Sequence, residues 1–447
     1  MTSATIPLAP PLPWRRSIAW LLFLGPFFFL SYGFANHLAA ERAVVDSLFY
    51  DWERHIPFLP WTILPYWSID LLYGLSFLCC RDARAVDRHA LRLLSAQLLA
   101  VACFLAFPLR FAFERPTSDG LFGALFDALR SFDQPYNQAP SLHIALLILI
   151  WIQFARLPGG PILRLVIHGW ALLIGISVLT TWQHHFIDVP TGAALGLFCL
   201  WLWPEAGTSP FAAANPIQAP RRRLAVLYGV GAALVGTSIA FIDSAALWLG
   251  WLAIALALVG WNYAWCDAAG FQKQAGRHSL GAALLLAPYT LSAWLNSRWW
   301  TRRRPAPDCI VDDVWQGRLP TSAEMKAGGF TALCDLTAEL PAPFGPWRYV
   351  CHPWLDLVAP TAEQLLAAAR SIETLHGRGP VLVACALGYS RSAGAVASWL
   401  HLTGRTESMA AALALLSERH PAVVVTPGLR AVLAEVESLI AQGGSHA

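Results

Sequence analysis

Long apolar runs fill most of the first 270 residues, and charged residues become common only after about residue 300. Each run approaches the length that an α-helix needs to cross about 30 Å of hydrocarbon. The pattern therefore predicts an all-α polytopic membrane helix bundle followed by a soluble domain. The predicted spans are 18–36, 60–79, 91–109, 142–157, 163–181, 187–204, 224–242 and 245–265.

After residue 304 the pattern changes to short β-branched runs at 310–314, 348–351 and 381–384. Amphipathic runs separate and follow them, which is typical of an α/β domain with a central sheet flanked by helices. The expected helices are 361–376, 391–403, 407–418 and 427–441. The expected domains are an N-terminal tail (1–16), a transmembrane domain (17–204), a linker (205–223), an extra transmembrane hairpin with a further apolar segment (224–304) and the soluble domain (305–447).

Arginine clusters mark the expected topology. Arg15 and Arg16 precede the first run, which we interpret as a retained anchor, and further clusters lie in the alternate connections 81–92, 156–164 and 221–223. By the positive-inside rule these segments face the cytoplasm, and eight spans leave the soluble domain there too. Specific binding of lipid headgroups by the clusters is the alternative interpretation. The expected location is the cell membrane, in a multi-pass arrangement.

A ninth apolar run, 279–295, complicates this topology. Pro288 interrupts it and basic residues flank both ends, so we interpret it as a re-entrant or interfacial segment on the inner leaflet. If it spans the membrane, the soluble domain lies outside or an earlier span is miscounted.

Composition supports a membrane protein. The chain is 56% hydrophobic and 13% charged, whereas soluble domains average about 25% charged residues. The formal net charge is only +3, and the arginines are explained by topology. Membrane lipids are therefore the expected partners, and nucleic acid is not.

The soluble domain contains a cysteine motif with a clear chemical meaning. A buried strand ends at Cys385, a short loop containing Gly388 follows, and Arg391 and Ser392 begin a helix. Amides of such a loop, together with the helix N-terminus, bind phosphate and stabilise a thiolate. The arginine fork holds two phosphate oxygens. Asp356, 29 residues before the cysteine, is placed to protonate a leaving oxygen.

A cysteine followed six residues later by arginine also occurs by chance, but the flanking strand, glycine and helix argue against chance here. On these residues, 308–440 resembles the dual-specificity branch of the protein tyrosine phosphatase superfamily. The resemblance implies that Cys385 is the nucleophile, Arg391 and the loop residues Gly388 and Ser390 bind phosphate, Asp356 is the general acid and Ser392 assists thiolate release. The family usually has His before the cysteine, where this chain has Ala384.

A second constellation lies in the predicted membrane domain. Arg115, Ser141, His143, His184 and Asp188 are far apart in sequence, but the intervening spans bring them to one face of the bundle. Ionisable residues at membrane depth are costly and suggest function. Because Asp188 follows His184 by four residues, its carboxylate can fix the imidazole tautomer and leave the other nitrogen as a nucleophile. The remaining histidine, His143, then serves as the acid.

Residues 60–204 resemble the type 2 phosphatidic acid phosphatase superfamily through Arg115-Pro116, Pro140-Ser141-Leu142-His143 and Ser177 with His184-x3-Asp188. The family's lysine and second arginine are replaced by Pro108 and Val178. The doubled His184-His185, Leu142 in the second motif and the missing arginine resemble the inositol phosphorylceramide synthase branch, which transfers a phosphoalcohol between lipids. The resemblance implies that Arg115 and Ser141 bind phosphate.

Two other interpretations of these residues remain. They are ordinary interfacial side chains, or they form a metal site that includes His185, although no spacing matches a known zinc motif. We expect no metal and no cofactor.

Two functions follow. The first is a bifunctional membrane phosphoester enzyme: a cytoplasmic cysteine-dependent phosphatase, acting on a lipid monophosphate or a phosphoprotein, joined to a histidine-dependent lipid phosphatase or phosphotransferase on the opposite face. The second is a signalling phosphatase anchored or regulated by an inactive membrane sensor domain. The loop 386–390 has no Lys or Arg to grip a multiply phosphorylated ring, so a singly phosphorylated lipid head or phosphoresidue is expected.

Overall fold

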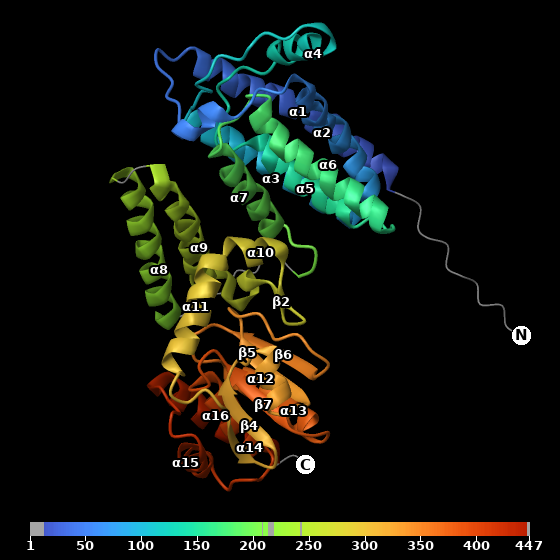
Figure 1. The fold of residues 1–447 in the computed structure, drawn as a ribbon. Helices are drawn as coiled ribbons and strands as arrows, with labels where there is room; N and C mark the ends of the chain where they lie inside the picture. Colours follow the sequence, from blue (N-terminus) through green and yellow to red (C-terminus); the bar gives the residue numbers. More distant parts are fainter. Residues whose placement is uncertain (1–12, 208, 213–218, 242–243, 445–447) are drawn as a thin grey trace, which may run out of the picture. The chain divides into compact units, whose positions relative to one another are not determined.

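The computed structural model describes residues 13–207, 209–212, 219–241 and 244–444. They divide into two compact units, residues 1–206 and 207–447, and each is treated by itself (Figure 1). We call them the first unit and the second unit.

The first unit is a helix bundle whose central helices approach closely. Helix α5 packs against α7, and at Gly192 an added Cβ would lie 2.3 Å from the carbonyl oxygen of Ser141. At Gly196 it would lie 2.9 Å from the carbonyl oxygen of Ala145. Small residues thus permit backbone contact between helices, as is common in membranes. The helices are α1 (Trp14–Ala40), α2 (Ile63–Ser76), α3 (Ala83–Ala106), α4 (Gly120–Arg130), α5 (Leu142–Ala155), α6 (Pro161–Thr180) and α7 (Asp188–Leu202).

Within the described ranges, five helical segments are long and apolar enough to cross a membrane, which confirms the membrane-like character predicted from sequence. The predicted runs 142–157 and 187–204 form shorter apolar helices, and part of the run 224–242 lies outside the described residues. The five segments are Trp14–Ala40, Pro60–Cys79, Ala83–Ala106, Pro161–Thr180 and Ala246–Phe271.

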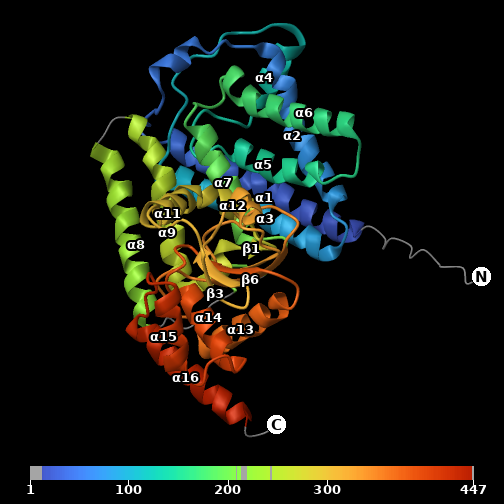
Figure 2. The same ribbon diagram turned by 60° about the horizontal axis from the view of Figure 1, so that its bottom comes forward.

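The second unit begins with apolar helices. Helix α8 (Ala219–Ser238) packs along α9 (Leu249–Trp261), and α11 (Ala287–Trp300) also contacts α9 (Figures 1 and 2). The ninth apolar run forms two helices that are separated at Leu286. The second of them, α11, has a proline in its first turn. Between α9 and α11 lie a π turn η6 (Asn262–Cys266), a 3₁₀ turn η7 (Asp267–Phe271), a hairpin of β1 (Lys273–Gln274) and β2 (Arg277–His278), and α10 (Leu280–Leu285).

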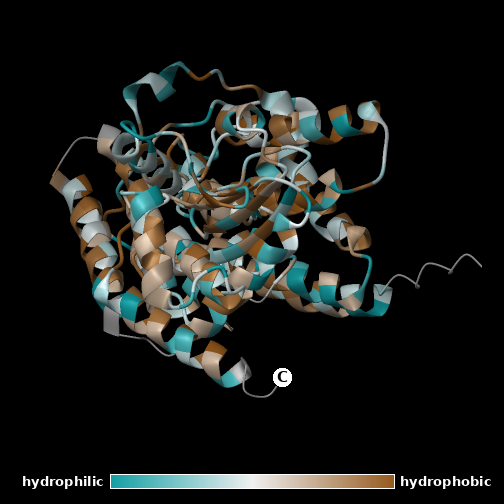
Figure 3. Cartoon of the chain, turned by 90° about the horizontal axis from the view of Figure 1, so that it is seen from below, coloured by the Kyte–Doolittle hydropathy of each residue, from teal (hydrophilic) through white to brown (hydrophobic). Residues whose placement is uncertain are grey.

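The rest of the second unit confirms the predicted sheet flanked by helices. The strand order of this sheet is β3-β4-β7-β5-β6; its β3–β4 pair is antiparallel, and its other described pairs are parallel. These strands include some of the most apolar segments of the chain (brown in Figure 3). The strands are β3 (Asp308–Val311), β4 (Val314–Arg318), β5 (Ala332–Thr337), β6 (Arg348–Trp354) and β7 (Val381–Cys385).

Successive residues of β7 point to opposite faces of the sheet, so they pack into two different hydrophobic cores. Val381 and Val383 pack with the helices α13 (Ala362–His376) and α14 (Arg391–Leu402) on one face, while Leu382 and Ala384 pack with α12 (Ser322–Ala327) on the other. Helices α15 (Met409–Arg419) and α16 (Pro427–Gly444) complete the first face. Because β4, β7, β5 and β6 are parallel, their carboxyl ends meet at one edge, where ligand sites of α/β sheets form.

Candidate active sites

The loop 385–391, which we call the phosphate loop, leaves this edge at the end of β7 and leads into α14. Gly388 has φ +82°, and an added Cβ would lie 2.4 Å from the carbonyl carbon of Gly317, so only glycine fits. The buried Gln316 side chain donates to the carbonyl oxygen of Gly388 at 2.9 Å. Strand β4 therefore holds the phosphate loop through this hydrogen bond.

Cys385 is buried at the base of this loop, with 3% of its surface exposed. Its Sγ accepts a hydrogen bond from the backbone N–H of Gly388 at 3.2 Å and lies 3.5 Å from the hydroxyl of Ser392. The Gly388 amide and the N-terminus of α14 can stabilise negative charge on sulfur, as a thiolate nucleophile requires. The predicted nucleophile and Ser392 are thus in contact.

Arg391 is held by a carboxylate that sequence reasoning missed. Its two terminal nitrogens bind the two oxygens of Glu339 at 3.0 and 2.6 Å, and Nη1 also donates to the carbonyl oxygen of Trp354 at 2.8 Å. Burial opposes ionisation of Glu339, but the Arg391 charge and hydrogen bonds hold the pKa of this carboxyl below its usual value. This bidentate pair fixes the plane of the guanidinium.

Asp356 lies in the loop 355–360, which we call the acid loop. Its Oδ1 is 3.0 Å from Nη2 of Arg391. Burial raises the pKa of the Asp356 carboxyl, and the nearby Glu339 carboxylate adds to this, although Arg391 opposes it. A raised pKa keeps this carboxyl protonated to higher pH, as a general acid requires.

The pocket above the phosphate loop has a volume of about 220 Å³. Of the described residues that line it, only Asp356 and Arg391 are charged. Its walls are otherwise largely apolar and include Leu357, Val358 and Val424. The pocket thus has one cation for one phosphate.

We expect Asp356→Asn to slow the hydrolysis of phosphates with poor leaving groups by about 10²- to 10³-fold, and of activated aryl phosphates much less. Only a poor leaving oxygen needs the proton. In the wild type, turnover should fall as pH rises through the raised Asp356 pKa, because the acid is then ionised. Measured kcat against pH for phenyl phosphate should lose this basic limb in the variant. If kcat of Asp356→Asn still falls at high pH, the fall comes from the ionisation of another group.

The histidine constellation forms in the first unit where α5 and α7 meet. Nδ1 of His184 lies 3.2 Å from Oδ2 of Asp188, and both side chains are buried. The same carboxylate oxygen accepts from the backbone N–H of His185 at 2.9 Å, and the N–H of Ser141 donates to the carbonyl oxygen of Asp188 at 3.1 Å. The predicted orientation of His184 by Asp188 is therefore present.

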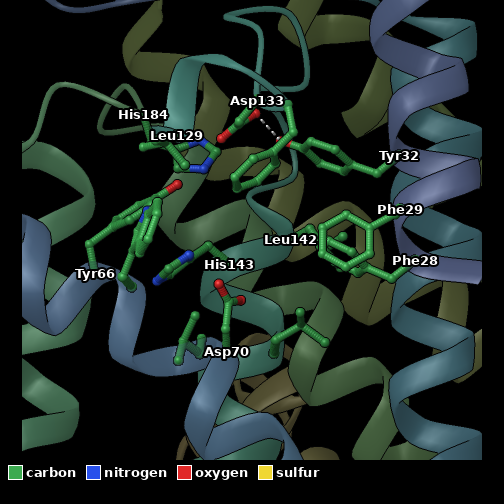
Figure 4. Close-up of a pocket in the computed structure, with 14 residues that line it drawn as sticks. Phe28, Phe29, Tyr32, Tyr66, Asp70, Leu129, Asp133, Leu142, His143 and His184 are labelled. Atoms are coloured by element: carbon green, nitrogen blue, oxygen red, sulfur yellow. Dashed lines mark hydrogen bonds between the residues drawn. The ribbon is translucent and has the colours of Figure 1, made fainter. Parts of the chain in front are cut away.

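His143 and His184 line one cavity (Figure 4). The His143 ring stacks on Tyr66 with 4.2 Å between ring centroids. Two carboxylates absent from the sequence prediction, Asp70 and Asp133, line the same cavity, and the Tyr32 hydroxyl donates to Asp133 at 2.9 Å. In Figure 4 the His143 ring lies between His184 and Asp70. The arrangement can place a reacting group between two imidazoles.

The predicted phosphate-binding residues Arg115 and Ser141 are not among the residues that line this cavity. The guanidinium of Arg115 packs over the Phe126 ring, 4.9 Å from its centroid, beside the side-chain amide of Gln183. The hydroxyl oxygen of Ser141 accepts from the N–H of Ile144 and so caps α5.

His185, the residue after His184, contacts groups outside the cavity. Nδ1 of His185 lies 2.9 Å from Oε2 of Glu53, and Nε2 accepts from the backbone N–H of Ala112 at 3.0 Å. The His185 ring therefore has partners on both nitrogens, away from the cavity that His143 and His184 line.

Sequence signals existed for two of the missed carboxylates. Asp70 is the one acidic residue in the apolar run 60–79, and intramembrane acids suggest function. Glu339 lies two residues after the end of β5, whose carboxyl end must lie beside that of β7 in a parallel sheet. Asp133 sits in a polar loop that carries no comparable signal.

No family model matches this chain, and no curated protein matches it. Solved structures similar to part of this chain include the following three proteins. Tk-PTP in its active form is 30% identical, with 30% of this chain and 98% of that chain covered and a TM-score of 0.28. Human DUSP28 is 19% identical, with 30% and 99% covered and a TM-score of 0.28. PTPMT1 is 17% identical, with 32% and 99% covered and a TM-score of 0.29.

Proposed function

We propose that the second unit is a cysteine-dependent phosphatase for phosphate monoesters. The observation that carries this proposal is one pocket lined by Cys385, Arg391 and Asp356, in which the sulfur of Cys385 accepts a hydrogen bond from the N–H of Gly388. The thiolate attacks phosphorus, the P–O bond to the alcohol breaks, and Asp356 protonates the departing oxygen. Water then attacks the phosphocysteine with Asp356 as base, and Ser392 donates to the departing sulfur.

The substrate of this site is a singly phosphorylated lipid head, with a phosphoprotein as the alternative. The apolar walls of the pocket and its single cation, Arg391, support a monophosphate next to apolar surface. The same unit contains the span-length segment Ala246–Phe271, which would hold the pocket near lipid. All nine cysteines, each within the described residues, are free, which suits the reducing cytoplasm that the thiolate needs.

The test uses the purified full chain carrying His184→Ala, so that phosphate release comes from the cysteine site alone. Vesicles containing phosphatidic acid or phosphatidylglycerophosphate would be compared with a phosphotyrosine peptide. We expect higher kcat/KM for a lipid. Preference for the peptide would favour the signalling phosphatase, and no phosphate release from any of them would contradict the proposed activity.

For the first unit we propose a histidine-dependent transfer of a phosphoalcohol between lipids. His184, oriented by Asp188, attacks phosphorus, the P–O bond to the donor lipid's alcohol breaks, and His143 protonates the departing oxygen. The hydroxyl of the acceptor lipid then attacks the phosphohistidine, His143 takes its proton, and the P–N bond to His184 breaks. The lining of the cavity favours this over monoester hydrolysis. Asp70 and Asp133 line it, and none of the described lining residues is Lys or Arg. Beside two carboxylates a dianionic monoester is disfavoured more than a phosphodiester with one charge.

This transfer is tested with reconstituted Cys385→Ser protein. Labelled phosphatidic acid, phosphatidylglycerophosphate and phosphatidylinositol would each be supplied with and without ceramide or diacylglycerol. We expect label to move from the phosphodiester to the acceptor. Release of free phosphate without an acceptor would leave a lipid phosphatase instead, and no turnover would favour a sensor role for the first unit.

A further inference from the structure

Three stretches of the second unit that precede the sheet contact the three loops that build the phosphatase pocket. The π turn η6 contacts the acid loop, the β1–β2 hairpin contacts the segment 335–342 that carries Glu339, and α11 contacts the phosphate loop. Nothing in the phosphatase-like sequence after residue 305 indicates these contacts.

The contact with the acid loop is made by Tyr263. Its hydroxyl donates to the backbone carbonyl oxygen of Asp356 at 2.9 Å. The Tyr263 ring is 1% exposed and stacks on Tyr228 of α8, with 5.4 Å between centroids. A short π-helical turn follows α9 at this point, and such turns commonly occur at functional positions. A rigid donor thus holds the backbone of the proposed general acid.

The acid loop needs such an anchor. Leu357, the next residue, has φ +59° and a side chain that is 74% exposed. A leucine in the left-handed region is strained and persists only when its surroundings fix it. The Tyr263 hydrogen bond, and the ion pair of Asp356 with Arg391, are contacts that fix this stretch.

The hairpin fixes the segment that holds Glu339. Nζ of Lys273 binds Oδ2 of Asp335 at 2.6 Å and the carbonyl oxygen of Thr337 at 2.8 Å. Nε2 of His278 lies 2.9 Å from the carbonyl oxygen of Ala338. Glu339 follows directly, so the partner of Arg391 is held from the same stretch of chain.

Helix α11 fixes the phosphate loop. The buried hydroxyl of Ser297 donates to the carbonyl oxygen of Ala386, next to the nucleophile. The Tyr389 hydroxyl donates to the carbonyl oxygen of Trp300 at 3.4 Å. All three loops are therefore braced from outside the phosphatase-like segment.

We propose that Tyr263 is a positioning residue that holds the acid loop so that Asp356 delivers its proton to the leaving group. This rests on the proposed phosphatase function of the second unit. Tyr263 touches no reacting atom; it acts through the backbone of Asp356. Without it, the loop opens toward solvent and the carboxyl moves away from the leaving oxygen.

The test is Tyr263→Phe in the full chain, purified in detergent, with the substrates phenyl phosphate and 4-nitrophenyl phosphate. We expect kcat for phenyl phosphate to fall about tenfold, with 4-nitrophenyl phosphate changed less than about twofold and KM unchanged. Burial is the largest cause of the raised Asp356 pKa, so opening the loop should lower this pKa, even though the opposing effect of the Arg391 charge also weakens. The basic limb of the phenyl phosphate profile should therefore move to lower pH.

The matched control is Tyr228→Phe, which keeps the ring that stacks on Tyr263 and removes a hydroxyl that pairs with Tyr289. It should leave both substrates and the pH profile unchanged. Equal losses on both substrates in Tyr263→Phe, with an unmoved pH profile, would reduce Tyr263 to a structural role and overturn the proposal. So would behaviour identical to Tyr228→Phe. If the wild type is no more active than Cys385→Ser, the phosphatase function itself fails, and that outcome is distinct from both.

Discussion

Replacing Cys385 with serine should abolish phosphomonoester turnover by the second unit, by at least about 10⁴-fold, the order seen when a catalytic nucleophile is removed. A serine hydroxyl stays protonated at neutral pH. Among the described residues, the hydrogen-bonding contacts of the side chain at position 385 are the N–H of Gly388 and the hydroxyl of Ser392, neither of which is a base, so serine cannot replace the thiolate. The phosphate loop is unchanged otherwise, and Arg391 is still held by Glu339. Inorganic phosphate should therefore bind with nearly unchanged affinity, measured calorimetrically beside the activity assay.

A second variant, at Arg391, should lower phosphate binding as well as turnover, in contrast to Cys385→Ser. Arg391→Lys keeps one positive charge against Glu339 but loses the planar fork, so phosphate affinity and turnover should both fall. This substitution is preferable to alanine, which would leave the buried Glu339 carboxylate without a partner.

Activity in Cys385→Ser close to that of the wild type would refute the covalent mechanism.

The second large effect concerns the first unit. In the Cys385→Ser background, His184→Ala and His143→Ala should each lower lipid turnover by orders of magnitude, because one removes the nucleophile and the other its acid. Asp188→Asn should be milder, since it keeps a hydrogen-bonding partner beside Nδ1 of His184. Transfer of label between lipids in reconstituted vesicles is the measurement.

The control is His168→Ala. This histidine lies on α6, is exposed, and has its Nδ1 beside the Trp151 indole rather than in the cavity. Its loss should leave lipid turnover unchanged. If His184→Ala and His168→Ala behave alike, the histidine mechanism is excluded, whatever the result at the cysteine site.

The residues that meet in the pocket of the second unit are mostly close together in sequence, so their proximity could be predicted. Cys385, Gly388, Arg391 and Ser392 fall within one strand–loop–helix, and the structure brings Asp356 to Arg391. Glu339 was not predicted, because it joins the site only through the parallel pairing of β5 with β7. No spacing in the sequence encodes that neighbour.

The brace from the preceding segment escaped prediction for a different reason. Tyr263 belongs to an apolar stretch that hydropathy assigns wholly to a membrane span or its edge. Periodicity reports which residues are apolar but not what a single hydroxyl at the end of the helix contacts. In the first unit, likewise, the pattern predicted that His143 and His184 meet, but not that α2 adds Asp70 to their cavity.

The ion pair of Lys273 with Asp335 has a consequence for how this chain can be recombined. Both side chains are 0% exposed, and the pair joins a hairpin before residue 280 to a strand of the sheet. A cut near residue 305 would leave Asp335 buried without its cation, and loss of one partner of such a pair costs about 3–5 kcal/mol. The part of the second unit after residue 305 therefore cannot be transferred to another protein by itself without this cost. A graft onto another anchor must carry the hairpin along, or replace Asp335 with a neutral side chain that fills the same space.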